Sequence, residues 1–322
     1  MTEVTCYVHG GYPHSEALVA AARDAARGRR PTIDVREQRC ADQAALEALQ
    51  RHAGLTFVSS GLLGWQDLFR PLAAACPGWS TGPLRRWFAT NTFVRAPVVR
   101  GTAGLDRCML AAALGKDGAA GKAGEVGTLP GPYTFSRVAD TTQDRDMLIE
   151  HLAQAVLRRA ADELVARGTR VIHLEEPWLA AHGIDDRCWP HLAAAVHRVR
   201  DGLGVPVVVV HTYFGDASPW LDRLRALPAD AVGVDFAETD LRALSGSWET
   251  GLLVGCIDGR SSLVEDPADI AALARLIIGA ADPPWLILSS GCDLALLPRT
   301  VADRKTRVLG DAAKLLNPDP AC

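Results

Sequence analysis

Short apolar runs alternate with longer amphipathic segments along the chain, which is typical of consecutive strand–helix units. Several runs are apolar at nearly every position, as strands buried on both faces are. Eight runs are predicted to be strands: Val4–His9, Leu55–Ser60, Leu129–Phe135, Arg170–Glu175, Val205–His211, Ala231–Phe236, Leu252–Ile257 and Trp285–Ser290. Because right-handed crossovers repeated eight times close a parallel sheet on itself, the pattern predicts a single (β/α)8 barrel, the TIM fold, over residues 1–322.

The segments between these runs carry helical periodicity. Apolar residues recur every four positions from Leu148 to Leu164, and Gly168 follows where a C-cap glycine would end the helix. Further helices are predicted over Asp186–Arg200 and Thr300–Leu316.

One region, residues 84–127, departs from the simple repeat. An extra extended piece is expected around Phe93–Val99. The stretch from Gly115 to Gly127 is rich in glycine, alanine and lysine, which predicts a mobile surface loop.

Composition narrows the class of protein. The formal charge is −4 over 322 residues, and lysine and arginine are scattered, so no nucleic-acid partner is expected. No apolar run is long enough to cross a membrane, and Met1–His9 lacks the features of a signal peptide, so the expected location is cytoplasmic. The eight cysteines include no Cys-x-x-Cys pair and are expected to be reduced thiols.

Polar residues gather where the predicted strands end. Active sites of such barrels lie at the C-terminal ends of the strands. These ends offer His9, Ser60, Tyr133, Thr134, Glu175, Glu176, His211, Asp235, Asp258, Arg260 and Cys292. Each alone can be a helix cap or a packing residue, but together they indicate a functional site.

His211, Asp235 and Cys292 form the candidate metal site. They end the fifth, sixth and eighth predicted strands, and imidazole, carboxylate and thiolate are all zinc ligands. Three protein ligands would leave a fourth position for a substrate, and a thiol bound there would lose its proton. The alternative is that the histidine and aspartate are caps and the cysteine is buried packing.

Further polar groups are candidates for binding and proton transfer. Strand alternation sends His173 and Glu175 to one face and Glu176 to the other. Glu175 can hold a substrate ammonium or act as a general base, or it can be a salt bridge across the rim. Arg260, after a glycine turn, can bind an anion or bridge two loops. Glu176, Arg260 and Tyr133 are the expected substrate-binding residues.

Short motifs in the predicted order resemble cobalamin-independent methionine synthase, and more closely its N-terminal barrel than its catalytic one. The matching stretches are Gly11-Tyr12-Pro13, Trp87-Phe88-Ala89-Thr90-Asn91, Leu129-Pro130-Gly131-Pro132-Tyr133-Thr134, Leu174-Glu175-Glu176-Pro177, Thr212-Tyr213-Phe214-Gly215-Asp216, Gly233-Val234-Asp235-Phe236, Ile257-Asp258-Gly259-Arg260 and Ser289-Ser290-Gly291-Cys292.

The resemblance implies a partial set of metal ligands. The family's catalytic barrel binds zinc through His-x-Cys, an acidic residue and a second cysteine. Here His211, Asp235 and Cys292 match three of these, while Tyr213 stands in place of the first cysteine. Glu175 matches an Asp of the family that binds the substrate amine.

Two positions depart from the catalytic barrel. Val138 stands where that barrel stacks an aromatic ring on folate, and Leu62 stands where it has an acidic residue for the homocysteine amine.

These observations lead to a metal-dependent methyl or alkyl transfer to a thiol or amino-acid-like substrate as the first hypothesis. Zinc is the expected metal, iron is possible, and the methyl donor is a methylfolate or a corrinoid, which allows a corrinoid or accessory protein as partner. Glu175 would hold the amine, and Tyr213 or Asp258 would transfer protons. Two alternatives are an iron-dependent or lyase-type enzyme of specialised metabolism, and a non-catalytic barrel that binds folate or a partner.

Overall fold

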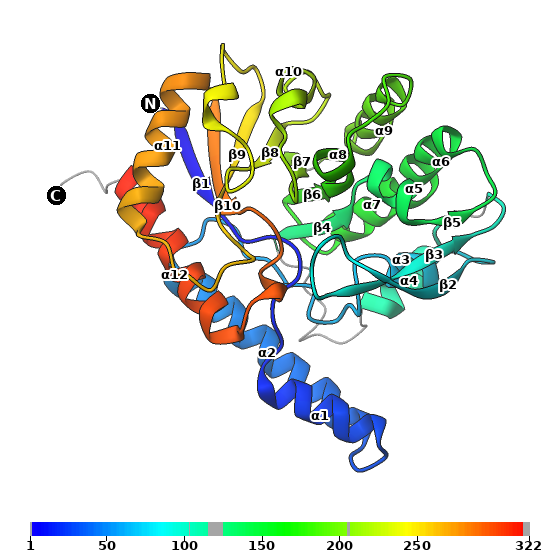
Figure 1. The fold of residues 1–322 in the computed structure, drawn as a ribbon. Helices are drawn as coiled ribbons and strands as arrows, with labels where there is room; N and C mark the ends of the chain where they lie inside the picture. Colours follow the sequence, from blue (N-terminus) through cyan, green and yellow to red (C-terminus); the bar gives the residue numbers. More distant parts are fainter. Residues whose placement is uncertain (1, 103, 115–124, 205–206, 318–322) are drawn as a thin grey trace.

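A curled parallel sheet with helices around it forms the body of the computed structural model (Figure 1). The structure describes residues 2–102, 104–114, 125–204 and 207–317. Seven strands pair in the order β1-β10-β9-β8-β7-β6-β4, every pair parallel. Their bounds are β1 Glu3–Cys6, β4 Val126–Pro130, β6 Val171–Glu175, β7 Val207–Thr212, β8 Ala231–Asp235, β9 Gly251–Ile257 and β10 Trp285–Ser290. Six of the eight predicted strands are therefore confirmed, four of them within one residue of the predicted bounds, and a seventh, Leu129–Phe135, is confirmed only in its first two residues.

The second predicted strand, residues 55–60, is not a regular strand. It lies between the two edge strands: Thr56 N–H donates to the Cys6 carbonyl at 2.9 Å, and Val126 N–H donates to the Val58 carbonyl at 3.1 Å. Ser59 forms only an isolated bridge to Val126. The Cys6 N–H donates to the Thr56 side-chain oxygen, so it is not free to form a main-chain hydrogen bond with this segment. Residues 55–60 therefore do not pair as a regular strand, and a complete (β/α)8 barrel is not confirmed.

The predicted strand Leu129–Phe135 is wrong beyond Pro130. Residues from Pro132 onward form a helix, α5, Pro132–Val138. Proline fixes φ in the helical range and needs no hydrogen bond in a first turn, so Pro132 starts the helix where an apolar run suggested a strand. The predicted loop 115–127 also ends early, because β4 begins at Val126, and residues 115–124 lie outside the described part of the chain.

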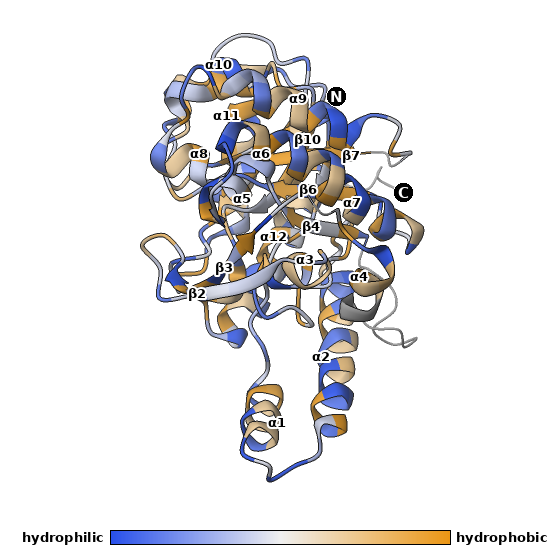
Figure 2. Cartoon of the chain, turned by 90° about the vertical axis from the view of Figure 1, so that its right-hand side faces the viewer, coloured by the Kyte–Doolittle hydropathy of each residue, from blue (hydrophilic) through white to orange (hydrophobic). Residues whose placement is uncertain are grey.

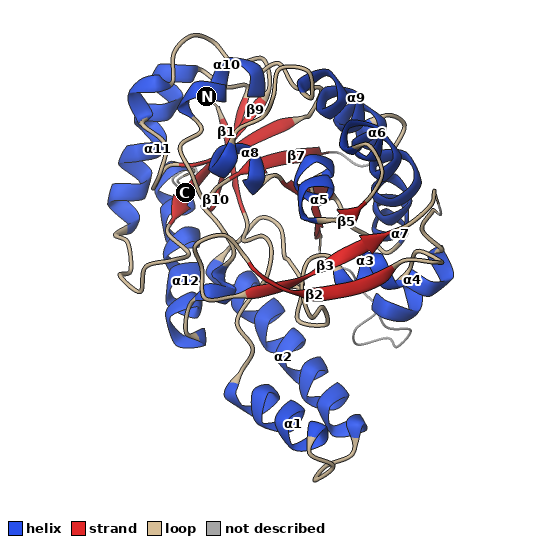
Figure 3. Ribbon diagram, turned by 45° about the vertical axis from the view of Figure 1, so that its right-hand side comes forward, coloured by secondary structure: helices blue, strands red, loops and turns tan. Residues whose placement is uncertain are grey.

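The helices surround the sheet (Figure 3). The helix predicted around Leu148–Leu164 runs as α6, a π-helical segment η1 and α7, and the two other predicted helices are confirmed as α9 and α12. The bounds are α3 Arg70–Ala74, α4 Arg107–Leu114, α6 Arg145–His151, η1 Leu152–Leu157, α7 Arg158–Ala166, α8 Pro177–His182, α9 Trp189–Arg200, α10 Leu221–Leu224, α11 Pro267–Ala281 and α12 Arg299–Leu316. Short 3-10 turns are η2 Ser218–Trp220, η3 Leu241–Ala243 and η4 Leu294–Leu296.

Two additions extend the body. Helices α1, Glu16–Ala26, and α2, Thr32–Ala53, form a hairpin that projects from it, with a hydrophilic loop at the tip (Figure 2). Strands β2, Ser80–Arg86, and β3, Phe93–Val99, pair as an antiparallel ribbon, and β3 also pairs with the short β5, Asp140–Thr141. The predicted extended piece Phe93–Val99 is thus confirmed. In the described part of the chain, no helix is long and apolar enough to cross a membrane.

Candidate functional site

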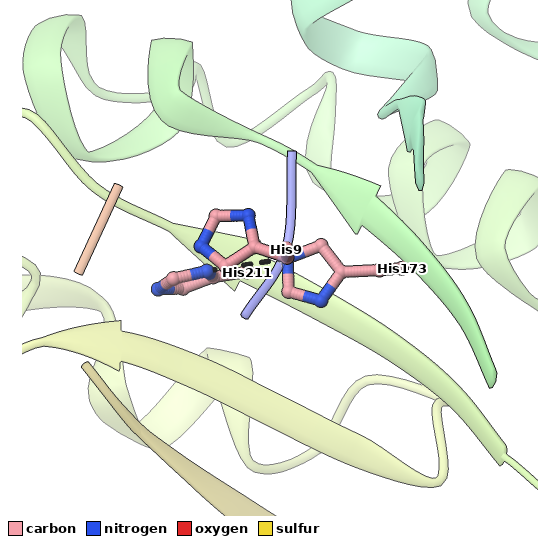
Figure 4. A group of neighbouring side chains, drawn as sticks. All are labelled: His9, His173 and His211. Carbon is pink, nitrogen blue, oxygen red and sulfur yellow. Dashed lines mark hydrogen bonds between the residues drawn. The ribbon is translucent and has the colours of Figure 1, made fainter. Parts of the chain in front are cut away.

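Three buried histidines lie side by side at the C-terminal half of the sheet (Figure 4). His9 follows β1, His173 is in β6 and His211 is in β7. His173 Nε2 lies 3.3 Å from His211 Nδ1, and the Tyr7 hydroxyl lies 3.0 Å from His173 Nδ1. The other nitrogen of His211, Nε2, is buried and has no hydrogen-bond partner.

His9 and His173 are stacked, and His211 lies edge-on to both rings and is hydrogen-bonded to His173. The rings of His9 and His173 lie 4.1 Å apart with an interplanar angle of 11°. An imidazole binds a metal in its own ring plane, so two stacked rings do not direct their lone pairs at a common point between them. Burial lowers the pKa of all three histidines, and for His173 and His211 it does so well below the ordinary range. All three rings are therefore neutral near pH 7.

A second cluster joins His9 to two carboxylates. His9 Nδ1 lies 3.1 Å from Glu175 Oε1, while His9 Nε2 lies 3.1 Å from the Ser290 carbonyl. The Tyr213 hydroxyl donates to Glu175 Oε2 at 2.8 Å, and Gly11 N–H donates to Asp293 Oδ1 at 2.5 Å. Burial raises the pKa of Glu175 and of Asp293 to about 7. This cluster therefore carries carboxyl groups that lack a described cationic side chain as partner.

A pocket of about 260 Å³ opens above this second cluster. Glu175, Asp293 and Asp67 are its acidic lining residues, and Tyr12, Trp65 and Trp87 contribute aromatic surface. The pocket thus combines an apolar wall with an acidic floor, as small-molecule sites commonly do. A larger cavity, about 560 Å³, lies at the opposite, N-terminal end of the strands and is lined by Glu3, Val207 and Trp285.

The predicted ligands Asp235 and Cys292 are both buried. Asp235 Oδ1 accepts from Ala237 N–H at 3.0 Å, and Oδ2 has no hydrogen bond, with Arg260 Nη2 3.6 Å away. Burial raises the pKa of Asp235 to about 6. Burial, with the nearby charge of Asp235, raises the pKa of the Cys292 thiol well above its ordinary value. Cys292 is therefore a neutral thiol near pH 7 unless a cation binds it.

Among the described residues, two groups place three potential ligand atoms within 4.8 Å of one another. These are His9–His173–His211 and His9–Glu175–Asp293. His211 belongs to the first, whereas Asp235 and Cys292 belong to neither. The metal set His211, Asp235 and Cys292 stays a prediction.

The remaining predicted site residues have partners inside the protein. Arg260 forms ion pairs with Glu238 and with Asp258, at 3.3 Å in the second case, besides its contact with Asp235. It bridges the ends of β8 and β9, and Asp258 accepts both its main-chain and its side-chain N–H. Roles for Arg260 and Asp258 toward a substrate stay predictions.

Glu176 and Tyr133 meet at the start of α5. The Glu176 carboxylate accepts from Tyr133 N–H at 2.8 Å and from Thr134 N–H at 2.7 Å, so it caps the positive end of this helix. The Tyr133 hydroxyl donates to the Gly183 carbonyl at 2.9 Å. A role for either residue in substrate binding stays a prediction.

Strand alternation at β6 is confirmed, since His173 and Glu175 both contact His9 while Glu176 turns to α5. In the cluster of His9, Glu175 and Asp293, the sequence pointed to His9 only as one of several strand-end residues, and it did not point to Asp293. The sequence signal for His9 was its position at the end of a predicted strand. The one signal that could have pointed to Asp293 is that it directly follows Cys292, a predicted metal ligand. His9 and Asp293 are 284 residues apart in the sequence, and no local pattern reveals that both lie next to the Glu175 carboxylate.

A curled parallel α/β sheet with a titratable cluster and a pocket at its strand ends is the architecture of a barrel-type enzyme domain. Residues 79–278 match the family described as cobalamin-independent synthase, N-terminal domain, and the chain belongs to this family. The resemblance found in the sequence motifs is thereby confirmed.

Relatives with related names cover different shares of the chain. A methionine synthase of Sulfurisphaera tokodaii is 25% identical over 306 residues, which is 92% of this chain and 88% of that protein. A 5-methyltetrahydropteroyltriglutamate–homocysteine methyltransferase of Herpetosiphon aurantiacus is 30% identical over 181 residues, 54% of this chain but 23% of that protein. The chain thus spans most of the first relative and about a quarter of the second. The expectation of a methionine-synthase-like methyltransferase agrees with these names.

Solved structures share the fold. A B12-independent methionine synthase from a Shewanella species, in complex with selenomethionine, superposes with a TM-score of 0.73 at 16% identity and covers 98% of both chains. A second structure, from Listeria monocytogenes, gives a TM-score of 0.69 at 14% identity and covers 98% of this chain and 99% of its own. A corrinoid donor or partner finds no support among these relatives.

Proposed function

We propose that this protein transfers a methyl group from a methylfolate to the thiol of homocysteine or a similar amino-acid thiol. The proposal rests on membership of the family, on relatives named for this reaction, and on a pocket at the strand ends with acidic and aromatic lining. In the transfer, the bond between the methyl carbon and the donor nitrogen breaks as the carbon–sulfur bond forms. The thiol gives up its proton, and the donor nitrogen gains one.

The single observation that supports a metal at this site is a pair of unsatisfied atoms. His211 Nε2 and Asp235 Oδ2 are both buried without a hydrogen bond. Unpartnered buried polar atoms are costly, and a bound ion or a water molecule would satisfy them. With the Cys292 sulfur they offer nitrogen, oxygen and sulfur donors, a set that fits zinc. Zinc held by these three residues would bind the substrate thiol as a thiolate.

The other groups have roles that follow from their contacts. The acidic floor of the pocket, Glu175 and Asp293, attracts the positive ammonium of an amino-acid substrate. Tyr213, which donates to Glu175, fixes the direction of that carboxyl group. Trp65 and Trp87 offer flat surface for the donor's ring, a role that Val138 cannot fill. Tyr213 and Asp258 are the proposed proton carriers.

Elemental analysis of untagged protein, purified without chelators, tests the metal. We expect close to one zinc per chain in the wild type, and loss of it in His211→Ala and Cys292→Ser. The matched control is Cys40→Ser, a cysteine on helix α2 that belongs to no candidate ligand group among the described residues. Methyl transfer from a methylfolate to homocysteine should be lost in the same two variants.

Other outcomes contradict the proposal in different ways. Iron in place of zinc would favour an iron-dependent or lyase-type enzyme. If neither His211→Ala nor Cys292→Ser changed the metal content, His211 and Cys292 would not be metal ligands. A wild type that binds methylfolate but no metal and transfers nothing would be a binding domain.

A further inference from the structure

The contact between His9 and Glu175 is incomplete without a cation or a shared proton. His9 Nε2 faces the Ser290 carbonyl, which can only accept, so this nitrogen carries the N–H. In the neutral ring, Nδ1 is then a bare lone pair. That lone pair lies 3.1 Å from Glu175 Oε1, another acceptor when ionised. Two acceptors at this distance repel unless something positive lies between them.

Asp293 brings a third acceptor to the same place. Its ligand oxygen lies within 4.8 Å of those of His9 and Glu175. Gly10 makes this approach possible: it has a φ of +65°, and a Cβ there would overlap Asp293 Oδ1 and lie 2.7 Å from Glu175 Oε1. Three acceptors, from the segment after β1, from β6 and from the segment after β10, therefore converge at the pocket.

The spacing matches a metal ion. Two ligands at right angles on an ion with bonds of about 2.1 Å lie about 3.0 Å apart, close to the 3.1 Å between His9 Nδ1 and Glu175 Oε1. The outer contacts also match, because metal-binding histidines donate their other N–H to a carbonyl and ligating carboxylates accept further hydrogen bonds. His9 donates to Ser290, Glu175 accepts from Tyr213, and Asp293 accepts from Gly11.

We propose that His9, Glu175 and Asp293 bind a hard divalent cation, of the Mn²⁺ or Fe²⁺ kind, at the floor of the pocket. One imidazole and two carboxylates favour such ions over those that prefer thiolates. The site shares no residue with His211, Asp235 and Cys292. A metal ion there would take the place of the substrate ammonium as the partner of Glu175 and Asp293, so this proposal does not rest on the proposed function.

The pocket explains why the ion is a metal and not only a substrate ammonium. Glu175 and Asp293 line the pocket, but His9 does not. An ammonium that enters from the pocket meets the two carboxylates but not His9, whereas a metal ion can bind all three groups at once. A bound metal keeps its remaining positions open toward the pocket, where a substrate can join it.

Mn²⁺ binding to protein first stripped with EDTA tests the proposal. The signal of free Mn²⁺ in electron paramagnetic resonance disappears on binding, so titration gives both stoichiometry and affinity. We expect one Mn²⁺ per chain, with affinity at least tenfold weaker in His9→Gln and Asp293→Asn. Asp293→Asn keeps an acceptor for Gly11 N–H, so it should fold even where His9→Gln does not.

Two matched controls separate this site from others. His14→Gln changes an exposed histidine that lines the same pocket outside the cluster, and it should bind Mn²⁺ like the wild type. Under the proposed function, Cys292→Ser should lose zinc but still bind Mn²⁺. The zinc site and the His9–Glu175–Asp293 site can therefore be tested independently of each other.

Three results would overturn the site. These are no Mn²⁺ uptake by the wild type at millimolar concentration, Mn²⁺ affinity that Asp293→Asn leaves unchanged, and Mn²⁺ lost in Cys292→Ser instead. A fourth, homocysteine binding to metal-free protein that weakens in Asp293→Asn while no Mn²⁺ binds, would assign the cluster to the substrate ammonium only.

Discussion

His211 Nδ1 lies 3.3 Å from His173 Nε2, and this contact decides which nitrogen of His211 is available for a metal. Both rings are neutral, because burial lowers their pKa well below the ordinary range. A neutral imidazole has one N–H. If His211 donates through Nδ1, its unpartnered Nε2 is a bare lone pair, and His173 must direct its own N–H toward the Tyr7 oxygen.

Substitution of His173 should therefore weaken metal binding at His211 without removing a ligand. In His173→Phe, His211 loses the acceptor that holds its tautomer, and we expect zinc affinity to fall about 10- to 100-fold. In His173→Gln, a side-chain carbonyl can accept the same N–H and should restore most of the affinity. Competition with a chromogenic chelator measures both.

The control for this pair is His197→Gln, an exposed histidine of α9. Equal zinc affinity in His173→Phe and His197→Gln would show that His173 does not position His211.

Gly10 should tolerate no side chain. In Gly10→Ala the new Cβ would overlap Asp293 Oδ1 and press on Glu175, so we expect Mn²⁺ affinity to fall at least tenfold and the free energy of unfolding to fall as well. Part of that loss comes from the positive φ alone, which costs an alanine about 1–2 kcal/mol. Urea unfolding and Mn²⁺ titration measure the two effects.

Gly28→Ala isolates the backbone contribution. Gly28 has a φ of +67°, and a Cβ added there would have no atom within 4 Å, so only the cost of φ remains. We expect Gly10→Ala to be clearly more destabilising than Gly28→Ala. Similar losses in the two variants would mean that the cluster yields to the added methyl group.

In metal-free protein, Glu175 and Asp293 should make stability depend on pH. Their ordinary pKa values are 4.5 and 3.8, and burial raises both to about 7. Between about pH 4 and pH 7, the two carboxyl groups are protonated in the folded protein and ionised in the unfolded chain. Unfolding therefore releases protons, and a rise in pH favours the unfolded state. The contribution to stability is present below about pH 4 and is lost as the pH rises through 7.

Urea unfolding between pH 5 and pH 8 in EDTA checks this sign. The doubly substituted Glu175→Gln, Asp293→Asn protein should show a flatter profile than the wild type. Saturating Mn²⁺ should flatten the wild-type profile too, since a bound cation favours ionised carboxylates. A wild-type stability that rises over the same range in EDTA would contradict the assignment.

Loss of the Tyr213 hydroxyl should affect Glu175 specifically. In Tyr213→Phe, the buried carboxyl loses the donor at 2.8 Å, and we expect the free energy of unfolding to fall by about 1–3 kcal/mol. That hydrogen bond lowers the pKa of Glu175, so its removal should raise this pKa further. The pH profile of stability reports the second effect.

Tyr12→Phe is the matched control, because its hydroxyl is also buried and contacts Asp303 and Thr306 instead. A similar loss of stability with an unchanged pH profile is expected there. If both variants leave the pH profile unchanged, Tyr213 does not set the pKa of Glu175.

The strands β6, β8, β9 and β10 were predicted from sequence within one residue or so of their bounds, because strands buried on both faces are continuous apolar runs. Around residues 55–60 and 129–135 the same rule was less successful. Thr56 diverts a main-chain hydrogen bond in the first case, and Pro132 starts a helix in the second. An apolar run cannot by itself distinguish a strand from a buried turn or helix.

The sequence by itself determined the parallel α/β architecture, the family, and the rim of polar residues at the strand ends, since these depend on periodicity and on local motifs. Only the tertiary structure decided which rim residues meet. It grouped His9, Glu175 and Asp293, assigned Glu176 to the cap of α5, and tied Arg260 to three carboxylates. Those pairings depend on the curvature of the sheet and on side-chain direction across strands, which no local pattern in the chain encodes.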